Sequence, residues 1–211
     1  MHRLGNANPS ISNMTASSDI MKAFEDLLAM LPPASQEAMR QLMASARERP
    51  RLGSLAQEAL ARLDAGDRES AVVDWVGRHL DACSDALAAL QALPRGLQVY
   101  YLSFVVEAQV MNGGFNQFFW NSSARFAPLI APALSDLGSP GAAEIFREAW
   151  AVAIAEGVER PKDCERSLEM FSASCAASRL QALDRPFCEL AMHFPALREK
   201  IAATNDPAFD V

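Results

Sequence analysis

The sequence lacks the residue patterns on which most enzymes of known mechanism rely. Its three histidines, His2, His79 and His193, lie far apart, and it has no HExxH, Walker loop, dinucleotide fingerprint, GxSxG elbow or cysteine cluster. We therefore expect no catalytic residue, no metal site and no cofactor. An uncharacterised enzyme, whose reacting groups meet only in the folded chain, stays open as an alternative.

Cysteine is scarce and forms no redox pattern. The chain has four cysteines and no CxxC pair. On a single helix, Cys164 and Cys175 would lie about 16 Å apart, beyond the reach of a disulfide. Cys83 and Cys188 also fall at apolar positions, so we expect all four to act as small core residues.

Long apolar runs are absent as well. The longest candidate, FAPLIAPAL at 126–134, contains two prolines and falls short of the roughly 18 residues that a membrane-spanning helix needs. The first residues, MHRLGNANPSISNMTASS, have neither the apolar core nor the cleavage site of a signal peptide. We expect a cytoplasmic protein that does not contact a membrane.

Positive charge is in deficit, and the deficit lies in one part of the chain. Residues 1–80 carry 10 acidic and 9 basic side chains, whereas residues 81–211 carry 16 acidic and 10 basic ones, a net charge of −6. This balance disfavours direct binding to nucleic acid and favours a basic protein partner.

Helical periodicity, in contrast, runs through the whole sequence. Half of the 211 residues are hydrophobic, they recur at spacings of three and four, and no run alternates as a β-strand does. The predicted fold is all-α, a helical bundle of about eight to ten helices. We expect a flexible segment at 1–17, an N-terminal helical region at 18–66, a larger C-terminal helical domain at 67–205 and a tail at 206–211. The oligomeric state is left open.

The clearest apolar stripe spans residues 73–90. It starts after a helix cap expected at Asp67 and stops at Pro94, and the rhythm resumes over residues 97–111. This pattern predicts two long antiparallel helices joined by a tight turn. Further caps are expected at Ser139, Asp163 and Asp184, and Pro195 is expected to break the last helix near His193.

The segment QVMNGGFNQFFWNSS at 109–123 joins two glycines to aromatic and amide side chains and carries no charge. Gly113 is expected to take the left-handed conformation that ends the preceding helix, and Gly114 to let the chain turn. None of these side chains titrates near neutral pH, so the segment offers no general acid, base or activated nucleophile.

Two interpretations of this NGGF motif stay open. In one, Asn112, Gln117 and Asn121 form an amide network beneath an aromatic layer and hold a helix junction together. In the other, the aromatic rings, including that of Trp120, and the nearby amides recognise a peptide or small ligand. The candidate residues for either role are Asn112, Gly113, Gly114, Phe115, Gln117, Phe118 and Asn121.

The run NGGFNQFFWNSS resembles the NGG-F-x-Q-F-x-x-N signature of a bacterial domain family that is described as of unknown function and named for the C-terminal domain of a DNA-mimic protein. LSDLG at 134–138, Asp163 with Arg166, and Leu183-Asp184-x-x-Phe187 are similar too, so the resemblance covers roughly residues 80–205. It implies an all-helical fold. For the founding member it also implies an acidic surface that imitates the phosphate array of DNA and captures a DNA-binding protein, such as a helix-turn-helix repressor.

The resemblance directs attention to seven acidic residues between 144 and 169. The candidate partner-binding acids are Glu144, Glu148, Glu156, Glu159, Asp163, Glu165 and Glu169. Interspersed bases, Arg147 among them, cancel much of their field, so a solvated helical face with ion pairs is the competing interpretation. The leading hypothesis is a noncatalytic protein-binding module, an acidic DNA mimic that engages a basic DNA-binding regulator. The alternatives are a peptide or small-ligand receptor and an uncharacterised enzyme.

Overall fold

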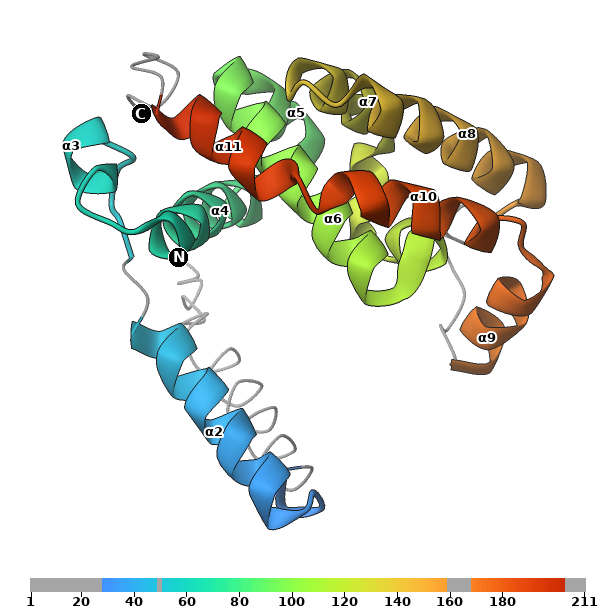
Figure 1. Cartoon of the computed structure of the whole chain (residues 1–211), viewed down its shortest axis with the longest axis horizontal. Helices are drawn as coiled ribbons and strands as arrows, with labels where there is room; N and C mark the ends of the chain where they lie inside the picture. Colours follow the sequence, from blue (N-terminus) through green and yellow to red (C-terminus); the bar gives the residue numbers. More distant parts are fainter. Residues whose placement is uncertain (1–27, 49–50, 159–167, 204–211) are drawn as a thin grey trace, which may run out of the picture. The chain divides into compact units, whose positions relative to one another are not determined.

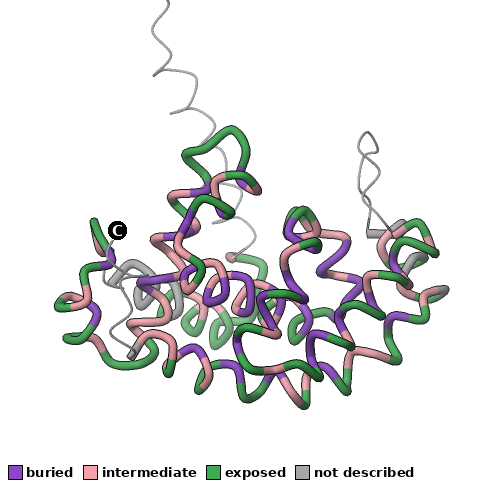
Figure 2. The backbone as a smooth tube through the Cα atoms, turned by 90° about the horizontal axis from the view of Figure 1, so that it is seen from above, coloured by how far each residue is buried: buried purple, intermediate pink, exposed green. Residues whose placement is uncertain are grey.

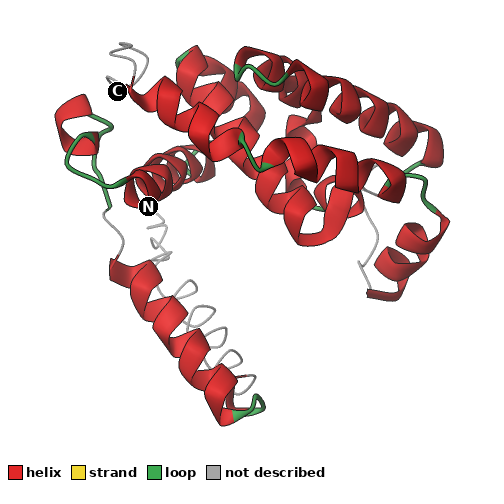
Figure 3. Cartoon of the chain, viewed as in Figure 1, coloured by secondary structure: helices red, strands yellow, loops and turns green. Residues whose placement is uncertain are grey.

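The computed structural model describes residues 28–48, 51–158 and 168–203 (Figure 1). Over these residues all regular structure is helical and none is strand (Figure 3), which confirms the predicted all-α helical bundle. The helices of the described chain are α2 (Pro33–Glu48), α3 (Gln57–Leu60), α4 (Ala65–Asp81), α5 (Ala86–Ala92), α6 (Arg95–Trp120), the 3-10 helix η1 (Ser122–Phe126), α7 (Ala127–Asp136), α8 (Pro140–Glu156), α9 (Leu168–Ala177), α10 (Gln181–Ala191) and α11 (Phe194–Ala203).

The chain divides into two compact units, Met1–Arg49 and Pro50–Val211. In the first unit the structure describes α2, which starts with a proline, a residue well suited to the first turn of a helix because its missing N–H has no partner there. The second unit contains α3 to α11. The contacts thus group residues 51–66 with the larger unit, whereas the sequence analysis placed them in the N-terminal region.

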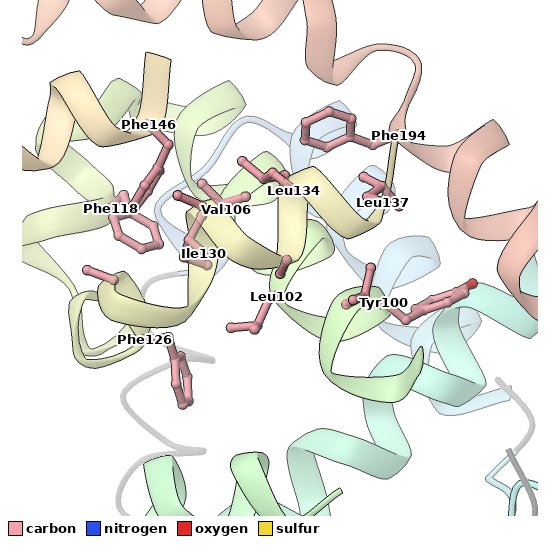
Figure 4. Close-up of a cluster of buried hydrophobic side chains, with 14 of the residues drawn as sticks. Tyr100, Leu102, Val106, Phe118, Phe126, Ile130, Leu134, Leu137, Phe146 and Phe194 are labelled. Carbon is pink, nitrogen blue, oxygen red and sulfur yellow. The ribbon is translucent and has the colours of Figure 1, made fainter. Parts of the chain in front are cut away.

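The core of the second unit forms around α6. In the longer helices of this unit, such as α4, α6 and α8, buried positions recur and alternate with exposed ones, as Figure 2 shows, because these helices turn one face inward. In Figure 4 the ring of Phe118 on α6 points toward that of Phe146 on α8, and the two centroids are 5.4 Å apart in an edge-on arrangement. Leu102 and Ile130 are likewise fully buried. Each such side chain contributes about 1.5–3 kcal/mol to folding.

The single long helix expected over residues 73–90 is in fact two helices. α4 ends at Asp81 and α5 begins at Ala86. The carboxylate of Asp85 accepts hydrogen bonds from the N–H groups of Leu87 and Ala88, both at 3.0 Å, and so starts α5. The prediction of one helix was wrong because a local cap interrupts a continuous apolar stripe.

The start of α4 and the segment between α4 and α5 also differ from expectation. The cap of α4 is Asp64, whose Oδ1 accepts from the N–H of Asp67 at 2.8 Å, so the cap expected at Asp67 lies three residues too late. Cys83 lies between α4 and α5 and is exposed, not buried in the core. Cys175 and Cys188 are half-buried, and Cys164 lies outside the described residues.

Downstream, the predicted helix boundaries agree better with the structure. α10 ends at Ala191 and α11 begins at Phe194, which confirms the break expected near His193. Ser139 precedes Pro140 at the start of α8, as expected, although the Ser139 side chain makes no capping hydrogen bond. The cap expected at Asp163 lies outside the described residues.

Candidate functional site

The NGGF motif lies at a break inside α6. Gly113 has φ −157° and ψ 25°, Gly114 has φ 73° and ψ −178°, and the chain is helical on both sides. The residue with positive φ is therefore Gly114, and the prediction that Gly113 would be left-handed was wrong. The conformation of Gly114 is essentially restricted to glycine, because a Cβ would collide with the backbone.

The carboxylate of Asp184 caps the helix where it restarts. Its Oδ1 accepts a hydrogen bond of 2.8 Å from the N–H of Phe115, although Asp184 lies 69 residues further on, in the first turn of α10. A Cβ on Gly114 would lie only 2.4 Å from Oδ2 of Asp184, so glycine at 114 also makes room for this carboxylate. The sequence analysis expected Asp184 to cap its own helix, but the N-cap of α10 is Leu180.

The aromatic residues of the motif belong to the core. Phe115 and Phe118 are fully buried, and the ring of Phe115 packs edge-on against that of Phe187 with 5.0 Å between centroids. Phe119 is also buried and stacks beside Phe115. A receptor pocket needs rings that a ligand can reach, so Phe115 and Phe118 are unsuited to the recognition role considered for them.

The amide side chains form a network, but at the surface and around a residue that the sequence analysis missed. Oε1 of Gln109 accepts from Nε2 of Gln117 at 3.1 Å and from Nδ2 of Asn121 at 2.6 Å. Nδ2 of Asn112 donates to Oε1 of Gln117 at 3.1 Å. Asn112 is exposed and the other three are half-buried, so the amides do not lie beneath the aromatic layer. Gln109 is one helical turn before the motif, and its identity alone did not distinguish it from a solvated side chain.

Comparison with known proteins identifies the region that contains these features. A family model described as DMP19-like protein matches residues 91–204, more than half of the 211-residue chain. The chain belongs to the DMP19-like protein family. The DMP19-like region runs from the end of α5 through α11 and includes the glycine break, the Asp184 cap and the acids of α8. Searches of curated proteins and of solved structures found no significant match.

A buried arginine ties α4, which precedes the DMP19-like region, to that region. Arg198 on α11 is 1% exposed, and its Nε donates to Oε2 of Glu69 on α4 at 2.8 Å. Its Nη1 lies 2.7 Å from Oε2 of Glu107 on α6, a charge contact without aligned hydrogen-bond geometry. The rings of Tyr100 and Phe104 face the same guanidinium, with centroids 5.9 Å and 5.5 Å away. Arg198 follows Leu197 of the last apolar stripe, and nothing in its spacing predicts that it is buried.

Burial raises the pKa of two groups in this cluster, Glu107 and Tyr100. Desolvation raises the pKa of Glu107 despite the opposing charge of Arg198. Desolvation, with a further contribution from the charge of Glu69, raises the pKa of Tyr100 to about 12. Both shifts reflect the cost of charging a group away from water. The guanidinium of Arg198 thus stabilises the charged form of Glu107, which burial otherwise disfavours.

Of the candidate acids whose side chains the structure describes, two are free on the surface. Glu144 and Glu148 are exposed on α8, one turn apart, and neither forms an ion pair with another described residue. Arg147 is exposed between them.

Glu156, at the end of the same helix, is engaged within the protein. Its Oε2 accepts from the hydroxyl of Ser178 at 2.7 Å, and its Oε1 pairs with Nε of Arg179 at 3.0 Å. The Ser178 hydrogen bond is the main reason that the pKa of Glu156 is lowered. Glu159, Asp163 and Glu165 lie outside the described residues, and for Glu169 the structure describes the helical backbone of α9 alone.

Metal-ligating side chains are dispersed over residues 28–48, 51–158 and 168–203. No cluster of three or more histidine, cysteine, aspartate or glutamate residues there is placed to hold a metal ion. The ring of His79 stacks on that of Trp75, with 5.5 Å between centroids. Within the same residues, the helices are too short or too polar to span a bilayer.

Proposed function

We propose that this member of the DMP19-like family is a noncatalytic protein-binding module that engages the basic surface of a DNA-binding regulator in place of DNA. The observation that carries the proposal is the family match over residues 91–204, since the resemblance of the NGGF motif pointed to DNA mimicry.

The charge of the region supports a basic partner. Residues 81–211 carry 16 acidic against 10 basic side chains. The exposed carboxylates of Glu144 and Glu148 lie about 6 Å apart along the axis of α8, and each is available because it has no ion pair with a described residue. Arg147 reduces the local field, so we expect these two acids to contribute as part of a longer surface.

The chemistry of the motif supports a noncatalytic role. Its amide and aromatic side chains do not exchange protons near neutral pH. Asp184, the titratable group that touches the motif, accepts the hydrogen bond that caps the helix at Phe115. The motif thus organises the bundle, and binding is assigned to the surface that the bundle displays.

The experiment is a capture of native partners by the full chain and by a Glu144→Gln, Glu148→Gln double variant. The control is Glu189→Gln, which removes an exposed carboxylate on α10 that pairs with Arg185. We expect the wild type and the control to retain a DNA-binding protein, and the double variant to bind it several-fold more weakly, with release by salt. Failure to enrich any DNA-binding protein would refute the proposal.

A further inference from the structure

The last described helix, α11, is held to α4 by two crossed ion pairs. It lies beside α4 and α6 in Figure 1. The dipeptide Arg-Glu occurs at 68–69 on α4 and again at 198–199 on α11. Nη2 of Arg198 lies 2.6 Å from Oε2 of Glu69. Nη1 of Arg68 pairs with Oε1 of Glu199. Each helix thus supplies one acid and one base to the contact.

A third acid, Glu107 of α6, makes the charges at this contact unequal. Its Oε2 lies 2.7 Å from Nη1 of Arg198, the same guanidinium that Glu69 binds. Arg68 is already bound to Glu199 and to two main-chain carbonyl oxygens. Three carboxylates therefore share two guanidinium groups, with a net charge of −1 when all five side chains are ionised. We call these five residues the α11 charge cluster.

Glu107 is the acid of the α11 charge cluster with the least access to water. Its side chain is 13% exposed, against 25% for Glu69 and 36% for Glu199. Desolvation raises the pKa of Glu107, the charge of Arg198 opposes that shift, and the charge of Glu69 adds to it. Because the nearby cation is shared with a second acid, the excess negative charge is removed at least cost by a proton on Glu107.

We propose that the α11 charge cluster is a pH-sensitive switch, in which protonation of Glu107 tightens the contact of α11 with α4 and α6. A neutral Glu107 leaves one acid, Glu69, against the guanidinium of Arg198, so the charges at the buried end of the contact balance. The switch acts within the chain and needs no partner.

The sign of the pH dependence follows from the two states of α11. When α11 separates from α6, Glu107 returns to water and titrates as an ordinary glutamate, near about pH 4.3. The closed state binds the proton more strongly, since burial raises the pKa of Glu107 there. The stabilisation of the closed state by this proton is complete below the ordinary pKa and is lost as the pH rises through the closed-state pKa.

The charges that act on Glu107 come from α4 and α11, through Glu69 and Arg198. Tyr100, on α6 itself, faces the guanidinium and stays neutral near pH 7, because burial raises its pKa to about 12. Asp184 of α10, a helix that also packs on α6, contacts the chain at Phe115, beyond the next two turns. The response to pH therefore depends on the charges of α4, α6 and α11.

The test measures how often α11 opens in the full chain, from hydrogen–deuterium exchange of its backbone amides between about pH 4 and about pH 7, corrected for intrinsic exchange. Glu107→Gln removes the titrating group and keeps the shape of the side chain. Glu189→Gln, which removes an exposed carboxylate on α10, is the control variant. The ¹³C signal of the Glu107 carboxyl group in the wild type reports its protonation directly.

We expect the open population of α11 in the wild type, divided by that in Glu107→Gln, to rise several-fold as the pH increases over this range. The midpoint should coincide with that of the Glu107 carboxyl signal, and Glu189→Gln should keep the pH dependence of the wild type. A ratio that stays constant or falls with pH would overturn the inference, as would a loss of the dependence in Glu189→Gln.

The wild type alone decides the outcome if Glu107→Gln does not fold. A Glu107 carboxyl midpoint above about pH 4.3, with slower corrected exchange in α11 on its acid side, would support the switch. A midpoint at or below that value, or exchange in α11 that does not respond at the midpoint, would overturn it.

Discussion

The main-chain N–H of Phe115 donates a 2.8 Å hydrogen bond to Oδ1 of Asp184, across 69 residues of sequence. This contact joins the two halves of the DMP19-like region at the point where α6 breaks and restarts. It also explains two sequence features together, since the second glycine of the motif gives the carboxylate room and the aspartate gives the new helix its cap.

The first prediction concerns the cap itself. Asp184→Ala should lower the free energy of unfolding by about 1–2 kcal/mol, because the buried N–H of Phe115 loses its acceptor. Asp184→Asn should cost less, because its amide oxygen can still accept the bond. Urea unfolding of both variants measures the difference, and equal stability of Asp184→Ala and wild type would rule out a capping role.

The second prediction follows from the pKa of Asp184. Burial raises this pKa above its ordinary value, and the hydrogen bond from Phe115 lowers it by a smaller amount. The folded state therefore binds this proton more readily than the unfolded chain, in which an aspartate titrates near about pH 3.9. The resulting stabilisation is complete below that pH and is lost as the pH rises through the folded-state pKa. The stability of wild type relative to Asp184→Asn should therefore fall as the pH rises above about 3.9. A difference that stays constant or grows with pH would contradict the shift.

The third prediction compares how much stability is lost when alanine replaces Gly114 or Gly113. Gly114→Ala should destabilise by about 2 kcal/mol or more, because it forces a positive φ on alanine and pushes a Cβ to 2.4 Å from the Asp184 carboxylate. At Gly113 the Cβ would approach Oε1 of Gln117 at 2.1 Å, but that is the end of a flexible side chain that can move away. Thermal unfolding of both alanine variants tests the order, and an equal or larger loss for Gly113→Ala would refute it.

The fourth prediction concerns Arg198. Arg198→Met should cost about 3–5 kcal/mol, because Glu69 and the largely buried Glu107 lose their shared cation. Adding Glu107→Gln should recover part of this loss by removing one stranded charge. Urea unfolding of the single and double variants checks both statements. If the double variant is no more stable than Arg198→Met, burial of an unpaired carboxylate is not the cause.

Local periodicity was sufficient to predict the fold class, because the apolar residues on the buried face of an amphipathic helix recur in the sequence at spacings of three and four. It could not separate α4 from α5, since the apolar stripe continues across a break that Asp85 sets by local capping. A helix junction was one of the two interpretations of the motif, but the choice between Gly113 and Gly114 depends on where the Asp184 carboxylate lies. That position is a long-range property of the packed chain.

The other residues whose roles could not be predicted also depend on long-range contacts in the packed chain. The partners of Gln109 lie 8 and 12 residues further along the chain, beyond the glycine break, and those of Arg198 lie on other helices. A polar residue beside an apolar stripe is usually solvated. The partner-binding role of the acids on α8 stays a prediction. For Glu156 the structure shows an ion pair with Arg179 and a hydrogen bond from Ser178, which spacing alone did not indicate.

The central claim is that the DMP19-like region occupies the DNA-binding surface of a basic regulator. Its most direct test measures the dissociation constant of the full chain for the captured regulator at low and high salt, with and without duplex DNA that the regulator binds. We predict that binding weakens as salt rises and that DNA and the chain exclude each other from the regulator. Affinity that is indifferent to salt, or a stable ternary complex with DNA, would contradict the account.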